Sequence, residues 1–323
     1  MTAGRRDLGA GRGGYRGSAA VRHGRAVQVR VPGSSANLGP GYDAVGLALG
    51  WYDDVDVEAT AAGAGAPDAS VEVRGEGAGR IAAGEANLVV RSVRTALERV
   101  GATQPHLHVR CRNGVPHGRG IGSSAAAVVA GVVAARGLLE RPDLLDDVTA
   151  LEVASDLEGH PDNAAASLLG GMTLGWAGQG GARAVRIEPH PDVVAVVCLP
   201  DGELSTARAR AMLPPTVPHT DAAFTAGRAA LLVEAVSRRP ELLLPATSER
   251  LHQAYRAPAM PETAALVEVL RSHGLAAVVS GAGPSVLVLG AGPGVRPRVE
   301  ELAGPGWRVE APGIDGRGAV LTA

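Results

Sequence analysis

Hydrophobic and polar residues alternate in several stretches of this chain, which is the pattern of half-buried β-strands. Val27, Val29 and Val31 alternate with other residues, and the 107–111 stretch repeats the pattern. Apolar runs without alternation predict strands that are buried on both faces. The other predicted strands are 44–49, 55–59, 193–199, 277–280 and 285–289, with a last one near the C-terminus.

Other stretches repeat their apolar residues every three or four positions, which predicts helices with one buried face. The clearest of these lies at 87–100 and ends at Gly101. Further helices are predicted at 123–139, 143–157, 162–171, 206–212, 221–238 and 261–272. Strands and helices follow each other without the strict alternation of a parallel sheet, so the predicted fold class is α+β.

The length of 323 residues suggests about two domains. The apolar strand at 193–199 is the natural opening of the second, so we expect an N-terminal domain over 26–185 and a C-terminal domain over 186–323. Residues 61–69, rich in Ala, Gly and Pro, predict a hairpin tip. Residues 1–25 contain seven Gly and six Arg with almost no large apolar side chain, which predicts a disordered arm.

Composition excludes several kinds of chemistry. All 31 basic residues are Arg, so a Schiff-base lysine, a P-loop lysine and the strand lysine of protein kinases are absent. A net charge of −2, with three Trp, four Tyr and one Phe, argues against a nucleic-acid partner. Only Cys111 and Cys198 are present, which excludes a disulfide framework and a multi-cysteine metal site and fits the cytoplasm. No apolar run approaches the length of a membrane span.

The strongest candidate for chemistry is Pro-His-Gly-Arg-Gly-Ile-Gly-Ser-Ser-Ala-Ala at 116–126, here called the 116–126 loop. Gly118, Gly120 and Gly122 let the backbone turn sharply and present N–H groups inward. The helix predicted to begin at Ser123 would add the partial positive charge of its N-terminus, where phosphate binds well. A purely structural glycine turn would explain the same residues. The loop is neither a Walker motif nor a dinucleotide fingerprint, since no Lys precedes the serines and the glycine spacing differs.

A phosphate-bound Mg²⁺ also needs oxygen ligands from the protein, commonly a carboxylate. Ser124 is the candidate hydroxyl ligand. Glu152, on the next predicted helix, is the candidate carboxylate. A solvated helix face would account for Glu152 equally well.

The segment Gly-His-Pro-Asp-Asn at 159–163 places an imidazole, a carboxylate and an amide directly before a helix. An Asp or Asn N-cap would account for Asp162 and Asn163 without any catalytic role. His160, Asp162 and Asn163 are therefore candidate binding residues with a structural alternative.

Two further loops combine glycine with polar side chains. Residues 34–43 hold Asn37 and Asp43 in a Gly/Pro frame, which a turn alone would also explain. Residues 280–285, Ser-Gly-Ala-Gly-Pro-Ser, lie between two apolar strands. Their glycines permit another backbone to approach closely, as would those of a plain hairpin turn.

In this order along the chain, the glycine-rich loops resemble the GHMP small-molecule kinase superfamily. The matching segments are 32–43, 116–125, 159–163, 204–210, 250–256 and 280–285. The 116–126 loop marks the superfamily, while 159–163 and the Leu-His-x-x-Tyr-Arg pattern within 250–256 point to its homoserine branch. The resemblance covers about 27–320. It implies an N-terminal α+β domain like the second domain of a small-subunit ribosomal protein, a ferredoxin-like C-terminal domain, and an active site between them.

The resemblance also implies an activity: ATP-dependent, in-line phosphorylation of the L-homoserine hydroxyl to O-phospho-L-homoserine, a step of threonine biosynthesis. Ser124 and Glu152 would hold Mg²⁺. The nucleotide-binding residues it implies are Asn87, Pro116, His117, Gly118, Arg119, Gly120, Ile121, Gly122, Ser123, Ser124 and Ala125.

For the acceptor, the resemblance implies a carboxylate bound by Arg210 and Arg256. The ammonium and hydroxyl groups of homoserine would contact Asn37, Asp43, His160, Asp162 and Asn163. Thr206, four residues before Arg210, would face the same cleft if both lie on one helix. Ser124, Glu152, Thr206 and Arg210 are the expected catalytic residues. Some relatives place an aspartate and a lysine near the acceptor hydroxyl, whereas this chain has Thr206 in that region, and Tyr42 stands where the family often has Phe.

Three alternatives stay open at this point. Another GHMP enzyme, of the mevalonate type, would want more cations around the cleft for a diphosphate substrate. A non-catalytic ligand-binding relative would have lost its metal site, and a nucleic-acid-binding protein would use the Arg-rich arm. The oligomeric state is also open, with a homodimer as the candidate assembly.

Overall fold

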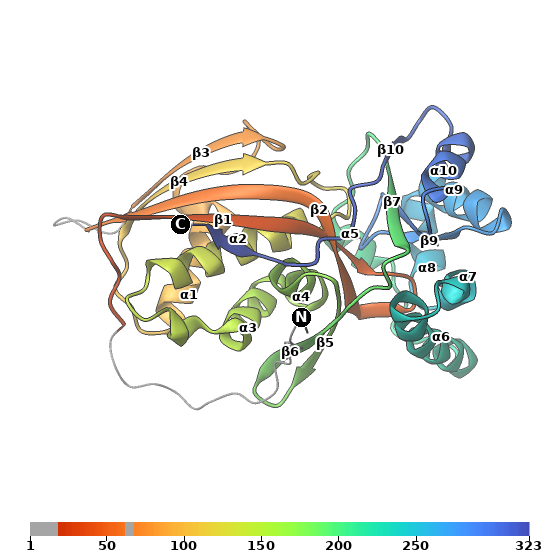
Figure 1. Ribbon diagram of the computed structural model, residues 1–323, viewed down its shortest axis with the longest axis horizontal. Helices are drawn as coiled ribbons and strands as arrows, with labels where there is room; N and C mark the ends of the chain where they lie inside the picture. The colour runs from red at the N-terminus through yellow and green to blue at the C-terminus, as the bar shows by residue number, and fades with distance from the viewer. Residues whose placement is uncertain (1–18, 62–67, 323) are drawn as a thin grey trace.

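The computed structural model describes residues 19–61 and 68–322, which form two lobes built on separate β-sheets (Figure 1). The first sheet has seven strands and the second has four. Because each sheet is packed against its own helices, the architecture is α+β, as the sequence predicts.

The first lobe contains most of the N-terminal half of the chain. Its main sheet has the strand order β11-β1-β2-β4-β3, and β5 and β6 extend it through β2. The strands are β1 (Arg25–Asn37), β2 (Gly41–Thr60), β3 (Ala69–Gly75), β4 (His106–Asn113), β5 (Met172–Gly178), β6 (Gly181–Ile187) and β11 (Val320–Thr322).

Four helices cover one face of this sheet (Figure 1): α1 (Leu88–Arg99), α2 (Ser123–Leu138), α3 (Asp147–Glu158) and α4 (Asp162–Leu169). The alternation along β2 explains this arrangement, since Val55 and Val57 are buried against the helices while Asp54 and Asp56 face outward. Helix α2 is built almost entirely from Ala, Val and Gly and lies in the centre of the helical layer.

The second lobe is a four-stranded antiparallel sheet with the order β10-β7-β9-β8. Its strands are β7 (Val193–Leu199), β8 (Ala276–Val279), β9 (Val286–Ala291) and β10 (Arg308–Glu310). The helices of this lobe are α5 (Thr206–Ala211), α6 (His219–Ser237), α7 (Leu243–Ala246), α8 (Gln253–Arg256), α9 (Pro261–Ser272) and α10 (Val295–Ala303).

Both faces of β7 are buried, which explains its unbroken apolar run. Val197 packs in a core shared with α6 and the first lobe, and Val196 packs against α9 and α10 on the other face. The first of these cores also includes Leu47 and Ile121 of the first lobe, so the two lobes meet through a common hydrophobic contact.

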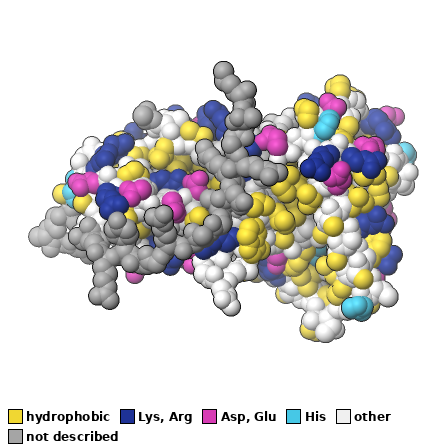
Figure 2. All heavy atoms as spheres, turned by 60° about the horizontal axis from the view of Figure 1, so that its bottom comes forward, with side chains coloured by type: hydrophobic (Ala, Val, Ile, Leu, Met, Phe, Trp, Pro, Cys, Tyr) yellow, Lys and Arg dark blue, Asp and Glu magenta, His cyan; other side chains and the backbone are white. Residues whose placement is uncertain are grey.

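Figure 2 shows the outer surface from the side below the view of Figure 1. On this face, apolar side chains gather over the second lobe, while acidic and basic side chains are interspersed on the first lobe. The interspersed charges agree with the small net charge of the chain.

The structure corrects two expectations about the ends of the chain. Residues 19–24 belong to no loose arm, because Ala19 and Val21 are buried and Val21 pairs with Leu139; the remaining arm residues 1–18 lie outside the described residues. The final strand, β11, does not stay in the second lobe but pairs with β1 in the first sheet. Local sequence patterns identify a strand but not its partner, which explains the second error.

The hairpin expected at 61–69 is also wrong. β2 and β3 are not neighbours, since β4 lies between them, antiparallel to β2 and parallel to β3. The tip itself, at 62–67, lies outside the described residues. The boundary expected at residue 185 stays a prediction; β6 of the first sheet ends at Ile187 and β7 of the second begins at Val193.

Candidate active site

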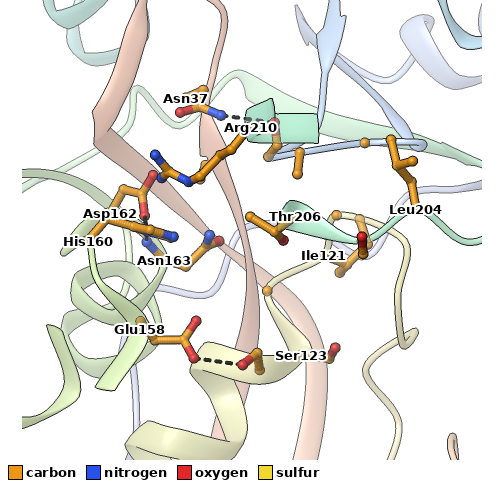
Figure 3. Close-up of a pocket in the computed structure, with 18 of the residues that line it drawn as sticks. Asn37, Ile121, Ser123, Glu158, His160, Asp162, Asn163, Leu204, Thr206 and Arg210 are labelled. Carbon is orange, nitrogen blue, oxygen red and sulfur yellow. Dashed lines mark hydrogen bonds and ion pairs between the residues drawn. The ribbon is translucent and has the colours of Figure 1, made fainter. Parts of the chain in front are cut away.

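A cavity of about 460 Å³ lies where the two lobes meet (Figure 3). Its lining includes residues from the 116–126 loop, from the ends of α3 and α4, from α5 and from the 280–285 loop. The predicted site residues that line it are Asn37, Asp43, Gly118, Gly120, Ile121, Gly122, Ser123, Ser124, His160, Asp162, Asn163, Thr206, Arg210 and Arg256. Segments far apart in the sequence therefore meet in one place, as expected.

The 116–126 loop owes its shape to glycine. Gly118, Gly120 and Gly122 all have positive φ angles, of 67°, 73° and 66°. Gly122 is the N-cap of α2, and no serine side chain caps that helix. The first N–H groups of a helix have no partner within it, so the start of α2 presents free donors and partial positive charge toward the cavity.

The 280–285 loop packs directly on this glycine turn. Ser280 Oγ donates to the carbonyl oxygen of Gly120 at 2.7 Å. A Cβ added at Gly120 would lie 2.2 Å from the carbonyl oxygen of Ser280. The close backbone approach expected for the 280–285 glycines is thus a contact with the 116–126 loop.

We expect Gly120→Ala to weaken both the fold and nucleotide binding. Alanine is strained at a φ of 73° and its Cβ would clash with Ser280, which should lower the free energy of unfolding by more than ~1 kcal/mol. Chemical denaturation and the KM for ATP test this. The matched control is Gly227→Ala in α6, where an added Cβ meets nothing within 4 Å and alanine favours the helix. Equal behaviour of the two variants would contradict the prediction.

The carboxylate beside Ser124 is Glu158, at the last position of α3. Ser124 Oγ donates to Glu158 Oε1 at 2.6 Å, the dashed contact in the lower part of Figure 3. Burial raises the pKa of the Glu158 carboxyl, and the hydrogen bond from Ser124 partly opposes that rise. A partly buried carboxylate next to a hydroxyl at a helix N-terminus is the donor set that a phosphate-bound Mg²⁺ requires.

The prediction that Glu152 shares a metal with Ser124 is wrong in this structure. Glu152 is buried on α3, six residues before Glu158. It accepts hydrogen bonds from Arg99 at 2.6 Å and from Arg183 at 2.7 Å. Its carboxylate is therefore engaged by two guanidinium groups and does not line the cavity. Sequence analysis missed Glu158, although its place directly before Gly159 and the His-Pro-Asp-Asn segment was an available signal.

Glu152 has a structural role that can be tested. The isosteric Glu152→Gln variant leaves the well-buried Arg183 without its carboxylate, and removing one partner of a buried pair costs about 3 kcal/mol. Since Arg99 is half-exposed, its pair contributes little of this. Urea unfolding should show the loss, while the Mg²⁺ concentration needed for half-maximal activity should not change. A changed Mg²⁺ requirement in a stable Glu152→Gln protein would return Glu152 to the metal site.

The two predicted carboxylate-binding arginines differ in their surroundings. Arg210 makes a bidentate ion pair with Asp43, at 2.7 and 3.0 Å, which raises the pKa of its guanidinium. Arg256 is 2% exposed and makes no ion pair among the described residues, and burial lowers its pKa. Its bonds to His252 Nδ1, the Gly281 carbonyl and the Tyr42 hydroxyl are all long, at 3.4 Å. Arg256 is thus a buried cation that needs an anion.

Tyr42 contacts both of these arginines. The guanidinium carbon of Arg210 lies 5.8 Å from the ring centroid and that of Arg256 lies 5.3 Å from it. Both guanidinium groups also donate to the Tyr42 hydroxyl, at 3.2 and 3.4 Å. Cations are attracted to the face of an aromatic ring, so Tyr42 stabilises two like charges in the same small space.

Asn37 acts within the loop that carries Tyr42 and Asp43. Asn37 and Asp43 have positive φ angles of 70° and 54°, a conformation that Asn and Asp tolerate better than most residues. Asn37 Oδ1 accepts from the Asp43 N–H at 3.0 Å, and its Nδ2 donates to the Gly281 carbonyl at 2.9 Å. Asn37 therefore fixes Asp43 and joins the two lobes at the cavity wall.

The 159–163 segment forms another wall of the cavity, where His160, Asp162 and Asn163 lie across from Ile121 and Leu204 (Figure 3). His160 Nδ1 and Asp162 Oδ1 are 2.5 Å apart, and this hydrogen bond raises the pKa of His160. Asn163 Oδ1 accepts from Ser34 Oγ at 3.0 Å. Thr206 begins α5 and lines the cavity together with Arg210 of the same helix, so the expected spacing of these two residues is confirmed.

A second cavity, of about 210 Å³, lies between the first sheet and the N-terminal ends of α1 and α2. Most of its lining is apolar, and it shares Ser123 and Ser124 with the first cavity. Asn87 and His117 line this second cavity. Asn87 Oδ1 accepts hydrogen bonds from the N–H groups of Val89 and Val90, so Asn87 is the N-cap of α1.

Three predicted nucleotide residues line neither of these cavities: Pro116, Arg119 and Ala125. Arg119 instead donates to the Asp201 carbonyl at 3.4 Å. The neighbouring Leu204 N–H donates to the Gly118 carbonyl, and Arg80 and Glu203 form an exposed ion pair. Segment 201–205 of the second lobe thus lies against the 116–126 loop.

Within the described part of the chain, no group of three or more His, Cys, Asp or Glu side chains is arranged to hold a metal ion. A metal at Ser124 and Glu158 would therefore need other ligands, such as phosphate oxygens. None of the described helices is both long and apolar enough to cross a bilayer.

Two family models match the chain. The model of the GHMP kinases N terminal domain matches residues 87–171, and that of the GHMP kinases C terminal domain matches residues 223–301. The first match contains the 116–126 loop, Glu158 and the 159–163 segment.

Full-length relatives are similar over most of the chain. The homoserine kinase of Streptomyces coelicolor is 53% identical over 297 residues, covering 92% of this chain and 94% of that protein. The homoserine kinase of Leifsonia xyli is 47% identical over 302 residues, covering 92% of each.

Two solved structures share the fold. The homoserine kinase of Cytophaga hutchinsonii has a TM-score of 0.78 at 23% identity, covering 92% of this chain and 97% of that chain. The mevalonate diphosphate decarboxylase of Staphylococcus aureus has a TM-score of 0.68 at 15% identity, covering 93% and 98%. At these identities the likeness concerns the fold alone.

Proposed function

Because this chain belongs to the GHMP kinase family, we propose that the cavity between its lobes transfers the γ-phosphoryl group of ATP to the side-chain hydroxyl of homoserine. The protein is an ATP-dependent small-molecule kinase with an alcohol as acceptor, and homoserine is its substrate. Its product, O-phospho-L-homoserine, belongs to threonine biosynthesis.

One observation carries the proposal for the site. The Ser124–Glu158 pair at the start of α2 lines the same cavity as Arg256, which is buried and forms no ion pair with any residue that the structure describes. The first arrangement suits the triphosphate and its metal, and the second suits the carboxylate of an amino acid. A phosphoryl donor and an amino-acid acceptor would thus bind side by side.

For the donor, we place the phosphates on the 116–126 loop and at the N-terminus of α2, where glycine leaves room for close approach. The nucleoside then extends into the second cavity, since Ser123 and Ser124 line both. Asn87 would lie beside it. Pro116, Arg119 and Ala125 would support the loop without contacting the nucleotide through their side chains.

Ser124 and Glu158 would hold Mg²⁺, with the phosphate oxygens completing its ligand set. When bound, the ion neutralises charge on the β- and γ-phosphates. Glu158 is suited to this because it is partly buried and because its one described hydrogen-bond partner, Ser124, is itself a candidate ligand.

For the acceptor, we propose that the carboxylate of homoserine binds Arg256 and that its ammonium binds Asp43. Before binding, Asp43 is occupied by Arg210. A zwitterion brings both a negative and a positive group into the cavity. Its carboxylate can pair with Arg210 and its ammonium with Asp43, so every charge in the site keeps an opposite partner. Arg210 then acts on both the substrate and Asp43.

His160, Asp162, Asn163 and Thr206 surround the remaining space, where the hydroxyl of homoserine would lie. His160 Nδ1 bonds Asp162, which orients the imidazole, and we assign both residues to binding the acceptor and not to removing its proton. We propose that these residues position the hydroxyl and that its proton leaves late, to solvent. Phosphoryl transfer depends mainly on positioning and on neutralising charge, which these residues can supply.

ADP release with ATP, Mg²⁺ and a panel of acceptors tests the proposal. Homoserine should be phosphorylated far better than serine, galactose or mevalonate, because only homoserine combines the zwitterion with a hydroxyl one carbon beyond that of serine. Activity on mevalonate without activity on homoserine would overturn the acceptor site.

A further inference from the structure

The core-facing side of β2 contains one carboxylate. Along this strand Val55, Val57 and Ala59 face the helices and are buried, and Asp53 continues the same row at 2% exposure. A strand position that faces the helices normally carries an apolar side chain. None of the roles proposed above uses Asp53.

One of the two oxygens of the Asp53 carboxylate has hydrogen-bond partners in the surrounding backbone. Asp53 Oδ1 accepts from the N–H groups of Gly114 and Val115, at 2.9 and 3.0 Å, and so holds the backbone that leads into the 116–126 loop. Asp53 Oδ2 has no hydrogen bond among the described residues. Burial raises the pKa of this carboxyl to about 6, and the two N–H bonds oppose the rise. Oδ2 is therefore the oxygen of this carboxylate that stays available to a ligand in the cavity that Asp53 lines.

Asp53 lines the second cavity, the place assigned above to the nucleoside. Val55, Val73, Ile81, Leu88 and Val89 give this cavity apolar walls that suit the faces of a purine. Its polar groups are few, and on the sheet side they are Asp53 and Asn113, which are directly opposite each other on β2 and β4.

We propose that Asp53 recognises the adenine base of ATP. Its free Oδ2 accepts a hydrogen bond from the 6-amino group of adenine and so selects adenine nucleotides over 6-oxopurine nucleotides. The inference rests on the nucleoside position proposed above. Adenine presents an N–H donor at position 6, whereas hypoxanthine presents a carbonyl oxygen there. A carboxylate oxygen attracts the first and repels the second, so one side chain can discriminate between them.

The wild-type enzyme gives the first test. Purine riboside 5′-triphosphate lacks only the 6-amino group, and it should show a kcat/KM about 10- to 100-fold below that of ATP, the worth of one hydrogen bond to a charged group. ITP should be used less well still. Equal kcat/KM for ATP and purine riboside triphosphate would overturn the inference without any substitution.

The isosteric Asp53→Asn variant gives the second test. Its amide oxygen can still accept from Gly114 and Val115, while its NH₂ can donate to the oxygen of hypoxanthine. The ratio of kcat/KM for ATP to that for ITP should fall at least about 10-fold, with the KM for homoserine unchanged. Asp54→Asn is the matched control, since Asp54 faces outward and pairs with Arg30. An unchanged ratio in Asp53→Asn would show that Asp53 only anchors residues 114 and 115.

A third variant separates this inference from the nucleoside position beneath it. Ala127 lines the same cavity, and Ala127→Phe would fill it. If Ala127→Phe leaves the KM for ATP unchanged, the nucleoside lies elsewhere and both proposals fail. If Ala127→Phe raises the KM for ATP while Asp53→Asn keeps the wild-type ATP/ITP ratio, only the role of Asp53 is overturned.

Discussion

Glu158→Gln should lower kcat for homoserine phosphorylation by ~10²–10³-fold, the usual cost of losing one group that stabilises transition-state charge. The substitution keeps the shape of the side chain and the contact with Ser124 but removes the charge that a metal ligand needs. The Mg²⁺ concentration for half-maximal activity should rise at the same time. Steady-state kinetics over a range of Mg²⁺ concentrations measures both effects.

Glu152→Gln is the matched control for this experiment, because it is the same chemical change six residues earlier in the same helix. We expect that variant to lose stability and to keep its Mg²⁺ requirement, the reverse of Glu158→Gln. If both variants kept full activity, the metal position at Ser124 and Glu158 would have to be abandoned. If only Glu152→Gln changed the Mg²⁺ requirement, the original sequence assignment would be restored.

Arg256→Ala should raise the KM for homoserine by ~10²-fold, equivalent to ~2.7 kcal/mol, because a buried charge-assisted hydrogen bond is lost. Arg256 lies on the acceptor side of the cavity, near Tyr42 and Gly281, so the KM for ATP should change little. Initial rates with one substrate varied at a time measure the two constants separately.

Arg296→Ala is a suitable control for removing an arginine, since Arg296 forms an exposed pair with Glu300 on α10, away from the cavity. That variant should match the wild type in both KM values. An Arg256→Ala enzyme with a raised KM for ATP and an unchanged KM for homoserine would place Arg256 beside the nucleotide instead.

Much of the architecture was predictable from local patterns. The alternation at Val27–Val31 and the helical spacing of 87–100 both correspond to observed elements, because burial of one face fixes these periods. The two-lobe arrangement and the meeting of the glycine-rich loops followed from the family resemblance. Strand pairing was not predictable in the same way: β11 returns to β1 and β4 separates β2 from β3, and neither pairing has a local signature.

The site shows the same division between local and non-local information. The 116–126 loop and the 159–163 segment could be assigned because glycine spacing and polar clusters are visible in the sequence. The choice between Glu152 and Glu158 could not be made from helix position alone, since both lie on α3. It depends on whether α3 places an acid near Arg99 and Arg183 or near Ser124, and those residues lie far away in the chain.

The return of β11 to the first sheet has a mechanical consequence. The chain passes from the first lobe to the second after β6 and passes back before β11, so two covalent tethers join the lobes. Two covalent connections restrict the motion of one lobe relative to the other to rotation about the line through them. We therefore expect any opening of the cavity to substrates to be a rotation about this single axis, which would break the contacts of 201–205 with the first lobe.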